Sequence, residues 1–67
     1  MEISLNGARH RFAGASLIDL LAENAIDHAK PGVAVAVNDA IVPRAEWATA
    51  SLKAGDTVEI VRPHSGG

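Results

Sequence analysis

The sequence opens with two short segments of alternating polarity joined by Asn6-Gly7, and this pattern constrains the fold more than any other feature. Residues 1–5 place every second apolar side chain on one face, as a half-buried strand does. An Asn-Gly pair is the strongest short signal for a hairpin, because a type I′ turn needs positive φ at both central residues. Residues 8–13 are therefore predicted to form the return strand, which ends at Gly14.

One amphipathic helix is predicted after this hairpin. Ser16 is the expected N-cap, and an acidic residue at position 19 is favourable near a helix N-terminus. One arc of the helix is apolar, and acidic residues recur every four positions on the opposite side. The apolar positions are Leu17, Ile18, Leu21, Ala22 and Ala25, and the acidic positions are Asp19, Glu23 and Asp27. The pattern predicts about three turns with a solvated acidic face, and Pro31-Gly32 ends the region.

The second half of the chain predicts three further strands. Valine and alanine alternate over residues 33–37, so this strand is either buried on both faces or turns its alanines outward. The following elements are a turn at Asn38-Asp39, a short strand at 41–42 that Pro43 stops, an irregular or briefly helical segment at 44–52, and a turn at 54–56. Residues 57–62 form the last strand, with Val58 and Ile60 pointing inward, and it ends at Pro63.

The order of these elements predicts the fold class. The first and last strands alternate most strongly, so we expect them to pair at the centre of a mixed sheet of four to five strands that wraps around the single helix. This is the β-grasp, or ubiquitin-like, architecture of the α+β class. We expect one domain over residues 1–63 and a flexible tail over residues 64–67, because the tail holds two glycines and no large apolar side chain.

Composition favours a carrier or binding module over an enzyme. Hydrophobic residues make up 48% of the 67 residues, but 13 of them are alanine and only 19 are larger. Ordering the chain costs roughly 100 kcal/mol at about 1.5 kcal/mol per residue. Almost every large apolar side chain is therefore needed in one small core, and little remains to build a deep catalytic pocket.

Charge and cysteine content argue against several classes of function. The chain has no cysteine, which removes disulfides, cysteine-based zinc sites and catalytic thiols. Its net charge of −2 argues against binding nucleic acid through phosphate contacts. His10, His28 and His64 are too widely spaced for a local metal motif, so we expect no metal. Without a long apolar run or a signal peptide, we expect a cytoplasmic protein that does not enter membranes and is a monomer when free.

The Gly66-Gly67 ending is the strongest candidate for a reactive site. Two glycines without Cβ atoms can pass through a narrow channel, and the five residues from Pro63 onward reach about 17 Å when extended. The terminal carboxylate is ionised at neutral pH and can attack the α-phosphate of ATP to give an acyl-adenylate. A partner enzyme must hold that ATP, because this chain has no phosphate-binding loop. The alternative is a frayed terminus with no chemical role.

The sequence resembles a known family, and the residues that carry the resemblance lie in its second half. The matching residues are Val35-Ala36-Val37-Asn38-Asp39, Val42-Pro43-Arg44, Glu46-Trp47, Leu52, Gly55-Asp56, Val58-Glu59-Ile60-Val61 and the final Gly-Gly. Together they resemble the sulfur carrier protein of thiamine biosynthesis, over the whole chain. The Gly-Asp and Gly-Gly pairs are shared with the small subunit of molybdopterin synthase, whereas Val-Pro-Arg-x-x-Trp favours the thiamine carrier. Ser65 is a departure, since glutamine is often found before the glycines.

The resemblance implies a carrier that is a cosubstrate and not an enzyme. An E1-like adenylyltransferase would activate the carboxylate of Gly67 with ATP. Sulfur from a cysteine desulfurase or a sulfurtransferase would then displace AMP and leave a thiocarboxylate, which thiazole synthase would use. The carrier itself would bind no cofactor. A molybdopterin-type carrier remains an alternative, and so does a ubiquitin-like interaction module whose tail does no chemistry.

The docking surface is expected beside the tail. If Val58 and Ile60 point inward, Val61 points outward on the opposite face of the sheet. We predict partner contacts at Val61, Arg62, His64 and Ser65, with Glu59, Ala34 and Ala36 on the same exposed face. Trp47 is expected to cover the edge of the core, and Arg44 to be solvated.

Overall fold

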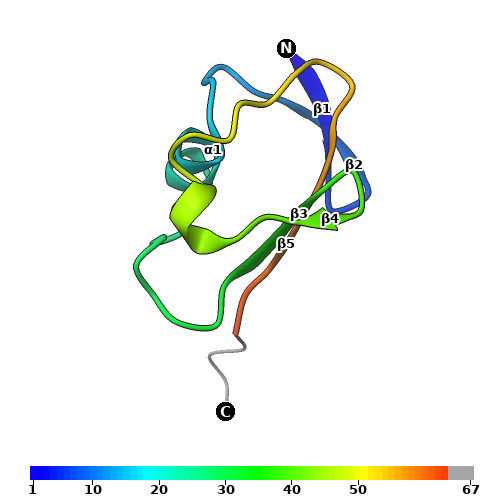
Figure 1. Cartoon of the computed structure of the whole chain (residues 1–67). Helices are drawn as coiled ribbons and strands as arrows, with labels where there is room; N and C mark the ends of the chain where they lie inside the picture. The colour runs from blue at the N-terminus through cyan, green and yellow to red at the C-terminus, as the bar shows by residue number, and fades with distance from the viewer. Residues whose placement is uncertain (64–67) are drawn as a thin grey trace.

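One mixed sheet of five strands and one helix across its face make up residues 1–63, the part of the chain that the computed structural model describes (Figure 1). The predicted α+β class and its β-grasp architecture are confirmed. The elements are β1 (Glu2–Leu5), β2 (Ala8–Arg11), α1 (Leu17–Glu23), β3 (Ala34–Val37), β4 (Ala40–Ile41), the 3-10 helix η1 (Arg44–Glu46) and β5 (Thr57–Val61). Their bounds differ from the predicted strands by one or two residues, which is the normal uncertainty at element ends.

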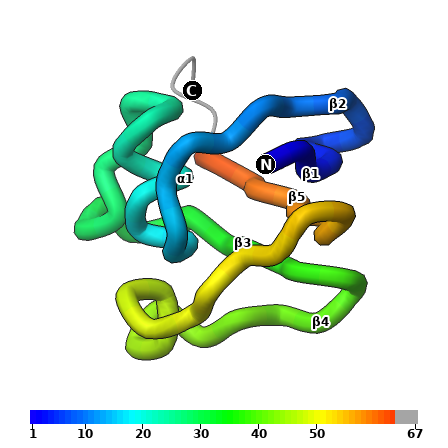
Figure 2. Tube along the Cα trace, turned by 90° about the horizontal axis from the view of Figure 1, so that it is seen from above, coloured from blue at the N-terminus to red at the C-terminus, as the bar shows by residue number. Residues whose placement is uncertain are grey.

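The strands lie in the order β2-β1-β5-β3-β4 (Figure 2). The first and last strands pair in parallel at the centre, as the alternation predicted, and the other pairs are antiparallel. Both tight hairpin turns have positive φ at their central residues, with 50° and 84° at Asn6-Gly7 and 52° and 70° at Asn38-Asp39. These values fit type I′ turns, so the two turns were correctly predicted from their residues.

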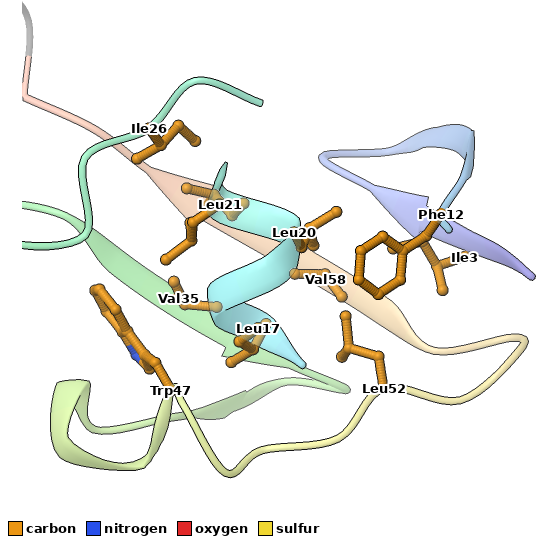
Figure 3. Packing of buried hydrophobic residues seen from close by; sticks show 11 residues of the cluster. Ile3, Phe12, Leu17, Leu20, Leu21, Ile26, Val35, Trp47, Leu52 and Val58 are labelled. Atoms are coloured by element: carbon orange, nitrogen blue, oxygen red, sulfur yellow. The ribbon is translucent and has the colours of Figure 1, made fainter. Parts of the chain in front are cut away.

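The core fills the space between α1 and one face of the sheet (Figure 3). Its buried side chains come from every part of the described chain: Ile3, Phe12, Leu17, Leu20, Leu21, Ile26, Val35, Trp47, Leu52, Val58 and Ile60. Trp47 is 1% exposed, and its indole Nε1 donates to the carbonyl oxygen of Val42 at 2.8 Å. Both observations confirm that Trp47 is a core residue.

The start of α1 is fixed by a capping box. The hydroxyl of Ser16 accepts from the backbone N–H of Asp19 at 3.3 Å, and the Asp19 carboxylate accepts from the N–H groups of Ala15 and Ser16 at 3.0 and 3.1 Å. The backbone donors hold the pKa of Asp19 below its usual value. The N–H of Leu17 also donates to the carbonyl oxygen of Ala50, which ties this end of the helix to the segment before β5.

The end of α1 corrects the predicted length. The helix has seven residues, about two turns, because Ala25 leaves the helical conformation with φ of 57°. The N–H of Ile26 donates to the carbonyl oxygen of Leu21 at 2.9 Å, and the N–H of Ala25 donates to that of Ala22 at 3.1 Å. These bonds form a Schellman ending, which normally has glycine where this chain has Ala25. The ending buries Ile26 beside Leu21 instead of extending the amphipathic pattern.

The three acidic residues are exposed, as predicted, and each also has a hydrogen-bond partner within the domain. Asp19 caps the helix, and Glu23 Oε1 lies 2.8 Å from His10 Nε2 on β2. Asp27 lies beyond the helix and accepts from the N–H of Ala29 at 2.9 Å. The acidic face is therefore solvated, but only Asp19 and Glu23 of its three members belong to the helix. Within residues 1–63, no helix is long and apolar enough to cross a membrane.

Candidate functional site

The face of the sheet turned away from α1 carries small residues and two exposed apolar ones. Its members are Ala34, Ala36, Ile41, Glu59 and Val61, and we call this surface the open face. Val61 is 62% exposed and Ile41 is 73% exposed. Val58 and Ile60 point into the core instead, as predicted. The third strand is therefore buried on one face only, and a shallow cleft of about 360 Å³ lies over the alanines of β3.

Asn6 borders the open face and joins the first hairpin to β5. Its side-chain oxygen accepts from the backbone N–H of Ile60 at 2.8 Å. The β1–β5 ladder pairs only as far as Leu5 with Val58, so this bond supplies the partner that the next donor of β5 needs. The Asn-Gly pair predicts only the turn, because it gives no sign of a contact 54 positions away.

The chain leaves the sheet at the end of β5, beside a second cleft. Arg62 and Lys30 line this cleft together with Asp27 and Pro63, and its volume is about 570 Å³. Arg62 is exposed, so its charge is available at the point where the tail begins. The structure therefore brings two predicted contact residues, Val61 and Arg62, to the root of the tail.

Four of the predicted site residues lie outside the described part of the chain. They are His64, Ser65, Gly66 and Gly67, and the predicted flexible tail consists of the same four residues. The structure thus describes the chain as far as Pro63, the residue before this predicted tail.

The sequence profile of the ThiS family matches residues 3–67, which is almost the whole chain and includes the Gly-Gly ending. The chain belongs to the ThiS family. A search of the curated proteins finds no match.

Two solved structures of one ThiS relative agree with this assignment. The crystal structure of the thiamine biosynthesis protein ThiS from Geobacter metallireducens is 27% identical, covers all of both chains, and superposes with a TM-score of 0.79. The NMR structure of a thiamine biosynthesis protein from the same organism is also 27% identical and gives a TM-score of 0.81. That match covers all of this chain and 88% of the other. Together, the matches support a sulfur carrier role in thiamine biosynthesis.

The polar side chains of residues 1–63 take part mainly in the structure of this ThiS-family domain. Across residues 1–63, every buried side-chain nitrogen or oxygen has a hydrogen-bond partner. No group of three or more histidine, aspartate or glutamate side chains in that range is placed to hold a metal ion. The buried polar side chains of residues 1–63 are thus hydrogen-bonded within the fold.

Arg44 has a structural role that the sequence did not predict. Its guanidinium lies 4.6 Å from the centre of the Trp47 ring, and one of its nitrogens donates to the carbonyl oxygen of Lys30 at 2.7 Å. The residue is exposed, as expected, and these contacts are additional to its exposure. The hydrogen bond to Lys30 joins η1 to the loop before β3, and the guanidinium lies over the ring of Trp47. Part of the Val-Pro-Arg-x-x-Trp signature is therefore explained by packing.

Proposed function

We propose that the carboxylate of Gly67 is the group that carries sulfur in this ThiS-family protein. The observation that carries the proposal is the family match, which extends through the Gly-Gly ending. Two features support it. The chain has no cysteine, so sulfur cannot be held on a side-chain thiol, and the polar groups inside the body are occupied in the fold.

The proposed chemistry proceeds in three steps. One oxygen of the Gly67 carboxylate attacks the α-phosphorus of ATP in an E1-like adenylyltransferase, and pyrophosphate leaves. The terminal sulfur of a persulfide then attacks the activated carbonyl carbon and AMP leaves, because an adenylate is a far better leaving group than an oxide. A second thiol of the sulfur donor attacks the bridging disulfide, which releases the thiocarboxylate and leaves a disulfide on the donor.

The carrier supplies the acyl group and its partners supply the catalysis. We propose an adenylyltransferase for activation, a cysteine desulfurase or sulfurtransferase as the sulfur source, and thiazole synthase as the acceptor. ATP is bound by the activating enzyme, and the carrier itself holds no cofactor. Because the reaction consumes ATP, we place it in the cytoplasm.

The open face is the proposed contact surface for the adenylyltransferase. Residues 64–67 span at most about 14 Å when extended, so an enzyme that processes Gly67 must lie against the surface around the end of β5. Val61 is on that surface, two residues before Pro63, and the neighbouring alanines of β3 let a partner approach the backbone closely. Arg62, His64 and Ser65 complete the proposed contact set.

Two variants of the terminus test the proposal. Deletion of Gly67, or addition of one alanine after it, moves the carboxylate by about one residue and is expected to abolish thiocarboxylate formation. The free energy of unfolding should stay the same, since no core residue is changed. Normal sulfur transfer by either variant would contradict the assignment. Assays with thiazole synthase and with the large subunit of molybdopterin synthase identify the acceptor.

A further inference from the structure

The register of β3 and β5 continues beyond the last assigned pair. The two strands pair Val37 with Val58 at one end and Ala34 with Val61 at the other. Two residues further in this antiparallel register, Gly32 lies opposite Pro63. Pro63, the residue before the tail, therefore still has a cross-strand neighbour, Gly32.

Gly32 is in close contact with the Pro63 ring. A Cβ atom placed on Gly32 would lie 3.2 Å from Cγ of Pro63 and 3.4 Å from both its Cβ and its Cδ. The shortest of these distances is tighter than ordinary van der Waals contact and the other two are at its limit, so the ring rests against the space that a side chain would fill. Gly32 also has φ of +89°, a conformation that favours glycine. Two independent features thus favour glycine at position 32, opposite Pro63.

The backbone entering this contact is restricted as well. Proline fixes its own φ near −65° and biases the residue before it, here Arg62, toward an extended conformation. Proline also has no N–H and cannot continue the ladder, so β5 ends at this point without pairing further. The chain therefore leaves the sheet in a direction set by β5, by the ring and by the backbone of Gly32.

We propose that Gly32 and Pro63 are positioning residues for activation of the tail: their contact directs residues 64–67 toward the active site of the adenylating enzyme. The inference rests on the proposed function. With a reach of at most about 14 Å, the tail must be nearly extended to enter a narrow channel, and it has little slack to correct a displaced root. The contact then raises the effective concentration of the carboxylate at the ATP site.

The surroundings of Pro63 indicate which part of the structure a substitution at Gly32 would move. Beside the ring is the cleft of about 570 Å³, whose lining includes Ala25, Ile26 and Val33. A Cβ atom at position 32 has only to move the ring by a few tenths of an ångström, and the cleft offers room for that shift. We therefore expect Gly32→Ala to displace the tail root and to leave the β3–β5 pairing intact.

Gly55 provides a matched control. Its φ is +88°, almost the same as that of Gly32, but a Cβ atom there would meet nothing within 4 Å. Gly32→Ala and Gly55→Ala thus place alanine at almost the same unfavourable φ and differ in the contact with Pro63. The rate of adenylate formation should fall about tenfold in Gly32→Ala relative to Gly55→Ala, in kcat with KM unchanged, since the open face is untouched. Equal kinetics in the two folded variants would overturn the inference.

A double-mutant cycle separates the contact from general destabilisation. Pro63→Ala removes the ring and should lower kcat to a similar extent, and adding Gly32→Ala to it should cause no further loss. Losses that multiply would show that the two residues act independently. If Gly32→Ala fails to fold, wild-type kcat in Pro63→Ala overturns the inference by itself.

An amide measurement gives a readout that does not depend on the enzyme. In ¹⁵N relaxation, the order parameter of the Arg62 amide should be lower in Gly32→Ala and Pro63→Ala than in wild type and Gly55→Ala. The same value in all four proteins would contradict the proposed contact. If wild type is not adenylated at all, the proposed function fails. If wild type is adenylated and Gly32→Ala matches its control, only this inference fails.

Discussion

The two faces of the sheet differ in what their side chains do. The covered face holds large residues that pack with α1 and η1, and Phe12, Val35 and Val58 there are at most 1% exposed. The open face holds Ala34, Ala36 and Glu59 between two exposed apolar residues, Ile41 and Val61. The same strands β3 and β5 contribute to both faces, because successive side chains alternate.

From this difference we expect stability and partner binding to depend on different faces of the sheet. The large side chains available to the chain are mostly used on the covered face, which determines whether the domain folds. The open face contributes little packing and is therefore free to determine what the domain binds. Substitutions on the two faces should accordingly affect different measurements.

The largest expected effect is on the covered face. Phe12→Ala removes a ring that is 1% exposed and should lower the free energy of unfolding by about 3 kcal/mol or more, measured by urea denaturation. Val61→Ala on the open face is the matched control and should change it by at most about 0.5 kcal/mol. If the two variants lose the same stability, the separation of the faces is wrong.

A smaller effect on stability is expected at Asp56, the residue directly before β5. Its carboxylate accepts from the N–H of Lys53 at 2.8 Å and from Nδ2 of Asn38 at 3.1 Å. These bonds, that of Lys53 first, hold the pKa of Asp56 below its ordinary value of 3.8. Because the pKa is lower in the folded state, this stabilisation is present above the unfolded-state pKa and is lost as pH falls through the folded-state pKa.

The variant Asp56→Asn should therefore lower the free energy of unfolding at neutral pH by about 2 kcal/mol, since it removes a charged acceptor of two hydrogen bonds. Its stability should also decline less steeply with acid than that of wild type. Urea denaturation at a series of pH values from neutral to strongly acidic measures both effects. Parallel pH curves for the two proteins would show that Asp56 does not contribute to the acid transition.

The open face is tested by a charge at its centre. Val61→Asp should weaken binding to the adenylating enzyme by about tenfold, or about 1.4 kcal/mol, because a carboxylate would be desolvated in the contact. The free energy of unfolding should change by less than about 1 kcal/mol. Val61→Thr, which has nearly the same shape without the charge, is the control. Normal activation kinetics in Val61→Asp would exclude the open face as the contact surface.

The smallest expected effect is on the free energy of unfolding at the end of α1, the helix that packs on the covered face. Ala25 has φ of 57°, so Ala25→Gly should raise the free energy of unfolding by about 0.5–1 kcal/mol. Ala22→Gly, three residues earlier and inside the helix, should lower it by about 1 kcal/mol. A loss of stability in both variants would mean that α1 continues through position 25.

Local residue chemistry made much of this fold predictable. Asn6-Gly7 and Asn38-Asp39 identified their turns, Ser16 identified the start of α1, and the alternation around Val58 identified the buried face of β5. These features depend on neighbours within a few positions, so the sequence alone is sufficient to predict them.

The features that were missed depend on contacts between distant positions. The helix ends early where Ala25 turns left-handed and Ile26 joins the core, although Ala25 gives no local signal for that conformation. The neighbours of Gly32 and Asn6 follow from the register of strands that are far apart in the sequence. In the candidate site, Val61 was correctly placed by alternation, whereas the contact between Gly32 and Pro63 appears only in the structure.

Intact mass spectrometry tests the central claim most directly. The protein would be incubated with ATP, the adenylating enzyme, a cysteine desulfurase and cysteine, and its mass compared with that of the Gly67 deletion treated in the same way. We predict a mass gain equal to the replacement of one oxygen by one sulfur, located at Gly67 and absent from the deletion. An unchanged mass, with the same enzymes active on another carrier, would contradict the account.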